Sequence, residues 1–140
     1  MKSSAKIESP TFAFRLDPCS GVPVYRQLID QVQAAIATGA LNVGDQLPTV
    51  RHVAVSLAIN PNTVLRAYRE MEIRGTLDTQ QGTGTFIAER NVEYSKGERE
   101  RQLGQLAGEF VSRAGAAGFN VKELIQALRE LAPDGESKRR

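Results

Sequence analysis

The 140-residue sequence predicts a mainly helical protein with one small β-hairpin. Three observations support this fold class. Apolar residues recur at intervals of three and four over several segments, as they do along one face of a helix. Between residues 76 and 87 the interval changes to two, which is typical of strands. The composition, 41% hydrophobic and 24% charged, suits a chain that folds around a buried core.

The scarcity of cysteine and histidine argues against several classes of protein. Cys19 is the only cysteine, so we expect no internal disulfide and no multi-cysteine zinc site. His52, the only histidine, lies in a different segment, and no paired carboxylates mark a cleft, which argues against an enzyme. No apolar run approaches the ~20 residues that span a bilayer, and residues 1–11 lack the apolar part of a secretory signal. We expect a cytoplasmic protein that uses no cofactor, no metal and no membrane.

Two helices are expected in the first part of the chain. Over residues 24–38 apolar side chains recur at every fourth position, and Gly39 provides a stop. A link with several turn-forming residues follows over residues 41–48. Thr49 is a suitable N-cap for a short second helix, which reaches Leu57.

The third helix has a clear start signal. Asn60 is a good N-cap residue, and Pro61 stands at the first helical position, where its missing N–H costs nothing. The helical pattern continues to Arg74 and stops at Gly75. Only residues 58–60 separate this helix from the one before it, and two short helices joined so closely form a helix-turn-helix.

A β-hairpin is expected directly after the third helix. Residues 76–79 and 85–87 have the period of strands, and residues 80–84 between them are rich in turn formers. An isolated two-stranded hairpin is only marginally stable, so we expect it to pack on the helices. Three helices followed by such a hairpin make a winged helix-turn-helix.

The outer face of the third helix carries side chains of the kind that read DNA. The helical turn places Asn62, Arg66 and Arg69 opposite the apolar face. In helix-turn-helix proteins this helix enters the major groove, where asparagine can pair with adenine and arginine with guanine. The start of the helix also offers free N–H groups, which favour phosphate. An ordinary solvated face is the alternative interpretation, and the sequence does not explain Ile73 on the same face.

Two further segments are expected to touch DNA. Arg51 lies at the start of the second helix, which crosses the DNA backbone in this geometry. The hairpin tip has small residues, so its backbone can approach phosphate or the minor groove; alternatively, its glycines serve only to supply positive φ angles. The candidate DNA-binding residues are Thr49, Arg51, Asn60, Pro61, Asn62, Thr63, Arg66, Arg69, Gln81, Gly82, Thr83 and Gly84.

Residues 22–90 resemble the DNA-binding domain of the GntR family of bacterial transcription regulators. Five runs carry the resemblance: Val24–Leu28, Gly44–Arg51, Asn60–Val64, Ala67–Tyr68 and Gly82–Phe86. The resemblance implies that Arg51, the polar residues Asn60, Asn62 and Thr63, and the wing tip contact operator DNA. Many members carry Ser-Arg at the positions of Asn60 and Pro61, and the missing arginine implies a different operator. With its short C-terminal region, the chain is similar to the YtrA subfamily.

Residues 91–118 read as one long helix with an unusually wide apolar surface. Large apolar residues form one strip and small residues form an adjacent strip, whereas an ordinary surface helix buries a narrower stripe. Charged residues along this helix argue against membrane insertion. Asn120 can cap a final helix that ends at Pro133. We therefore expect this helical hairpin to pair with its copy in a two-fold dimer, with packing on its own winged domain as the alternative.

These predictions divide the chain into four parts. These are a flexible tail over residues 1–11, a DNA-binding domain over 12–90, a dimerisation region over 91–132 and a flexible tail over 133–140. The residues expected in the dimer contact are Leu103, Gly104, Leu106, Ala107, Gly108, Phe110, Val111, Leu124, Ile125 and Leu128.

The predicted function is that of a transcriptional repressor which binds an inverted-repeat operator as a homodimer. Two recognition helices about 34 Å apart would reach successive major grooves. The net charge is only +2, so DNA binding depends on where the charges lie. The operator, the sign of regulation and a small-molecule effector are left open, since no residues indicate a ligand. The alternative is a protein-interaction adaptor without specific DNA binding, which leaves Asn62 and Arg66 without a role.

Overall fold

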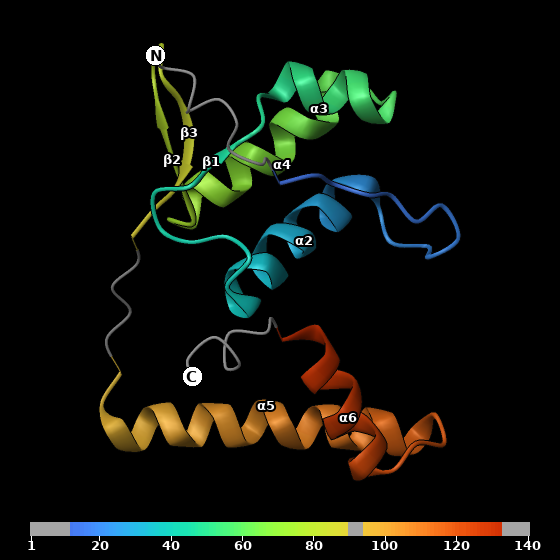
Figure 1. Ribbon diagram of the computed structural model, residues 1–140. Helices are drawn as coiled ribbons and strands as arrows, with labels where there is room; N and C mark the ends of the chain where they lie inside the picture. Colours follow the sequence, from blue (N-terminus) through green and yellow to red (C-terminus); the bar gives the residue numbers. More distant parts are fainter. Residues whose placement is uncertain (1–11, 90–93, 133–140) are drawn as a thin grey trace. The chain divides into compact units, whose positions relative to one another are not determined.

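The computed structural model describes residues 12–89 and 94–132, which contain five helices and three strands. The chain divides between residues 90 and 91 into two compact units (Figure 1). The tails expected over residues 1–11 and 133–140 lie outside the described residues. The mainly helical fold class is confirmed.

The three helices of the first unit lie where the sequence predicts them. Helix α2 spans Val24–Thr38, and Gly39 ends it in the left-handed conformation at φ 86°. Helix α3 spans Val50–Leu57, and helix α4 spans Pro61–Ile73, one residue shorter than predicted. The tight connection between α3 and α4 turns at Ala58, which has a positive φ of 57°. The helix-turn-helix is therefore confirmed.

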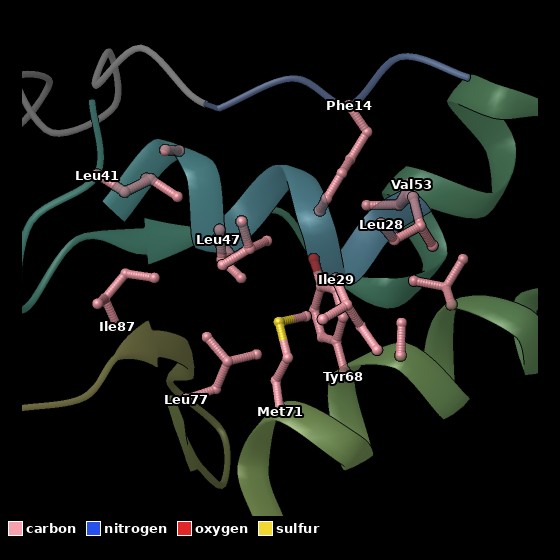
Figure 2. Close-up of a cluster of buried hydrophobic side chains, with 14 of the residues drawn as sticks. Phe14, Leu28, Ile29, Leu41, Leu47, Val53, Tyr68, Met71, Leu77 and Ile87 are labelled. Carbon is pink, nitrogen blue, oxygen red and sulfur yellow. The ribbon is translucent and has the colours of Figure 1, made fainter. Parts of the chain in front are cut away.

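The core of the first unit lies where α2, α3 and α4 meet the sheet, as Figure 2 shows. Leu28, Val32, Val64 and Met71 are completely buried at its centre. Tyr68 is also buried, and its hydroxyl donates a hydrogen bond of 2.6 Å to the Pro48 carbonyl oxygen. This bond ties α4 to the residue that precedes the N-cap of α3.

The wing is a three-stranded antiparallel sheet with the order β1-β3-β2, rather than the two-stranded hairpin that the sequence predicts. Strands β2 (Leu77–Gln80) and β3 (Gly84–Ile87) form the hairpin, with Leu77 opposite Ile87. Strand β1 (Gln46–Leu47) comes from the link before α3 and pairs with Thr85 and Phe86. Two residues are too few to show an apolar period, so this edge strand was not predicted.

The segment before α2 is fastened to that helix by two glutamine side chains. The Gln31 amide accepts the Arg15 N–H at 2.9 Å and donates to the Arg15 carbonyl oxygen at 2.6 Å. The Gln27 amide makes the same two-way contact with the backbone of Asp17 and also donates to the Val22 carbonyl oxygen. These bonds fix the approach of the chain to the first turn of α2.

The second unit is a pair of helices, α5 over Lys96–Ala116 and α6 over Val121–Leu131. The predicted start of the long helix at residue 91 is wrong for Tyr94 and Ser95, which precede the helix. Ser95 is its N-cap, because its hydroxyl accepts the Glu98 N–H and so starts the helix there. The cap predicted at Asn120 is confirmed, and with Glu123 it forms a reciprocal capping box.

Candidate nucleic-acid interface

The outer face of α4 presents polar side chains to solvent while the opposite face is buried in the core. Asn62, Arg66 and Arg69 are exposed, and Thr63 is half-buried beside them. A shallow groove on this face is lined by Asn62, Leu65, Arg66, Arg69, Glu70 and Ile73. The predicted facing of these side chains is confirmed, and Ile73 forms part of the apolar wall of the groove.

The expectation of free N–H groups at the start of α4 is wrong for Asn62 and Thr63. The Asn62 N–H donates to the side-chain oxygen of Asn60 at 2.8 Å, and the Thr63 N–H donates to the Asn60 carbonyl oxygen at 2.9 Å. A capping asparagine satisfies the same donors that a phosphate would need. The recognition surface of α4 therefore consists of its side chains rather than of its N-terminal N–H groups.

Arg66 does not extend freely into solvent. Its guanidinium carbon lies 3.8 Å from the centre of the Tyr25 ring, in the first turn of α2. The sequence does not predict this contact, since no local pattern links two helices that are distant in the chain. Among the residues in the described ranges, neither Arg66 nor Arg69 forms an ion pair, and Glu70 pairs with Arg74 at 2.7 Å.

The start of α3 lies next to α4 through the Tyr68 hydrogen bond to Pro48. Thr49 is the N-cap predicted from the sequence, and its hydroxyl accepts the His52 N–H at 3.0 Å. The Arg51 side chain is exposed. The helix start thus offers one cation to solvent, and the hydroxyl of Thr49 is already engaged.

The wing tip is exposed at Gln81, Gly82 and Thr83. Gly84 has a positive φ of 138°, which L side chains rarely adopt, and a Cβ there would also displace the end of the Gln46 side chain. That side chain reaches across from β1 and donates a hydrogen bond of 3.2 Å to the Thr83 carbonyl oxygen. The tip is therefore a braced backbone turn that carries little side-chain bulk.

The second unit exposes a large apolar surface. No residue of α5 or α6 is buried, and Leu124 is half-buried. The large apolar side chains with 41% to 67% of their surface exposed are Leu103, Leu106, Phe110, Val111, Phe119, Val121, Ile125, Leu128 and Leu131. At Gly104 and Gly108 an added Cβ would meet open space. The strips that the sequence assigns to a partner thus lie uncovered in this unit.

No helix within residues 12–89 and 94–132 has both the length and the apolar character needed to cross a membrane. The apolar surface of α5 and α6 is interrupted by charge, for example at Glu109 and Arg113. A protein surface is therefore a better match for it than a lipid core.

Comparison with known proteins identifies relatives over most of the chain. The family model described as bacterial regulatory proteins, gntR family, matches residues 24–87. The HTH-type transcriptional repressor YtrA of Bacillus subtilis is 36% identical over 124 residues, which are 86% of this chain and 92% of the relative.

Two solved structures extend the similarity to the fold. A transcriptional antiterminator from Listeria monocytogenes has a TM-score of 0.65 at 26% identity, and the match covers 89% of this chain and 93% of that chain. YtrA from Sulfolobus acidocaldarius, described as a GntR-family transcription factor, has a TM-score of 0.53 at 28% identity, with 75% and 99% covered. The similarity therefore reaches beyond the winged domain into the C-terminal helices.

Proposed function

The chain belongs to the GntR family of bacterial regulatory proteins, with relatives of the YtrA type, and is a transcriptional regulator; on this premise we propose that it is a repressor that binds an inverted-repeat operator as a homodimer. The observation that carries the proposal is the outer face of α4, where Asn62, Arg66 and Arg69 stand exposed on a helix whose other side is buried. The protein acts in the cytoplasm, on the DNA of its cell.

The candidate DNA-binding residues divide into three roles. Asn62 and Arg66 read base edges in the major groove, because amide and guanidinium groups match adenine and guanine there. Arg51, Arg69 and the wing tip contact the backbone, which fixes the register without reading sequence. Thr49 and Asn60 act through their caps, which hold the starts of α3 and α4 in place.

Dimerisation is supported by the exposed apolar surface of α5 and α6. Surfaces of this kind on a small protein mark contacts with other molecules, and a second copy supplies a matching strip. The open space at Gly104 and Gly108 lets a partner helix approach closely. In this proposal residues 12–90 bind DNA and residues 91–132 dimerise, so that the two-fold axis of the dimer imposes an inverted repeat on the operator.

Repression follows when such a dimer occupies DNA that the polymerase needs. A small molecule that acts on the pair of helices α5 and α6 and changes the relative tilt of the two DNA-binding domains would relieve repression. The repressor assignment takes its support from the name of the Bacillus subtilis relative.

The test is selection of bound duplexes from a random pool with the purified full chain. We expect an inverted repeat whose half-site centres lie about one helical turn or a multiple of it apart. With the selected duplex, Arg66→Ala should cost about 1–3 kcal/mol and relax the preference at one base pair. Arg15→Ala, at an exposed arginine before α2 that belongs neither to the candidate DNA-binding residues nor to the dimer contact, is the matched control and should leave binding unchanged. Equal affinity for every duplex at low salt would instead favour the adaptor alternative.

A further inference from the structure

Tyr25 and Arg66 join two segments that are distant in the sequence. Tyr25 lies in the first turn of α2, where its ring is half-buried and packs against the core. The guanidinium carbon of Arg66 lies 3.8 Å from the centre of this ring, well within the ~6 Å over which a cation and an aromatic face attract. Arg26 is a second cation near the same ring, at 5.8 Å. The ring is thus a fixed platform beneath an exposed arginine of the recognition helix.

We propose that Tyr25 is a positioning residue for DNA recognition: its ring aligns the Arg66 guanidinium before DNA arrives. The inference rests on the proposed function, in which the outer face of α4 binds an operator. Stacking on a ring uses the flat face of a guanidinium, whereas its N–H donors lie in the plane and point outward from the edge. The contact with Tyr25 therefore orders Arg66 and leaves its donors for DNA.

The surrounding charges support this role for the ring. Glu70 follows Arg66 by one helical turn and would be its ordinary helical partner. However, the Glu70 carboxylate binds Arg74 at 2.7 Å. Arg66 is consequently held by an uncharged ring, which fixes its direction without neutralising its charge. A long side chain that is already ordered loses less rotamer freedom when it binds.

The experiment measures dissociation constants on the selected duplex for the wild type, Tyr25→Leu, Arg66→Ala and the double variant. We expect Tyr25→Leu to weaken binding about two- to fivefold, the range of an exposed cation–π contact. Tyr25→Phe retains the ring and should bind like the wild type. Once Arg66 is alanine, loss of the ring should have no further effect, so the double variant should match Arg66→Ala alone.

The matched control is the same cycle with Arg69→Ala, where the effects of the two substitutions should multiply. Melting temperatures identify any variant with damaged packing. If Tyr25→Leu has a lowered melting temperature, Tyr25→Met is used in its place. Multiplying effects of Tyr25→Leu and Arg66→Ala, or tighter binding by Tyr25→Leu, would overturn the inference while leaving the proposed function intact. A wild type that binds no duplex would overturn both.

Discussion

The buried hydroxyl of Tyr68 provides a test of how the recognition helix is fastened to α3. Tyr68 is only 3% exposed, and Tyr68→Phe removes its hydroxyl while keeping the ring. The substitution deletes the 2.6 Å hydrogen bond and leaves the Pro48 carbonyl oxygen without that donor. Loss of one partner from a buried hydrogen bond costs about 1–2 kcal/mol. With a urea slope of about 2 kcal/mol per molar, the midpoint should fall by roughly 0.5–1 M.

The same hydroxyl predicts a distinct dependence of stability on pH. Burial raises the pKa of Tyr68 above its ordinary value of 10.0, because the ionised form is poorly solvated inside the protein. The contribution of the protonated hydroxyl to the free energy of unfolding is complete below pH 10. It is lost as the pH rises toward the raised pKa of Tyr68 in the folded state. Over that interval each pH unit removes up to about 1.4 kcal/mol from the wild type, whereas phenylalanine cannot ionise. The advantage of the wild type should therefore vanish within about one to two pH units above 10.

Urea unfolding of the full chain at a fixed protein concentration, repeated from pH 7 to pH 11.5, measures both effects. The fixed concentration matters because association alters apparent stability. Tyr94→Phe, at an exposed tyrosine of the second unit, is the matched control and should follow the wild type throughout. If the difference in free energy of unfolding between the wild type and Tyr68→Phe stays constant to pH 11.5, burial does not raise the pKa of Tyr68 as argued. An advantage absent at pH 7 would refute the hydrogen bond.

Three further substitutions test the cap of α4, the wing and the proposed dimer contact. Asn60→Ala should lower the free energy of unfolding by about 1 kcal/mol in urea titrations, because the Asn62 N–H loses its acceptor, whereas Asn60→Asp should keep most of it. Gly84→Ala should destabilise by about 1–3 kcal/mol, since φ is positive and the new Cβ meets Gln46; a folded variant of unchanged melting temperature would contradict this. Phe110→Asp should shift the protein to the monomer in sedimentation experiments and weaken operator binding, with Glu109→Asp as the control that should remain dimeric.

Elements with strong local signals were predictable from the sequence. Asn60 followed by proline marked the start of α4, and Asn120 marked the start of α6. The outer face of α4 followed from helical geometry alone. These features depend on residues within one or two turns, so their physics is local.

The features that the sequence did not predict depend on contacts between distant segments. Strand β1 has no period of its own and forms because Leu47 is buried while Gln46 braces the wing. The contact between Arg66 and Tyr25 exists only once α2 packs on α4. The start of α5 shifted to Ser95 because a capping hydroxyl, which the sequence analysis did not weigh there, outweighs the continuing helical pattern upstream.

The long-range contacts that were missed are also those that hold the recognition helix. Tyr68 ties the buried face of α4 to the start of α3, and Tyr25 stacks on an arginine at its exposed face. One tyrosine therefore fixes where the helix lies, and the other fixes how one of its side chains points. Apolar packing holds the buried face of the helix in place but is not directional, whereas a hydrogen bond and a stacked cation each prefer one arrangement of polar groups. Since base recognition depends on the placement of individual donors, we expect the Tyr25 contact to act mainly on recognition, whereas the Tyr68 bond acts mainly on stability.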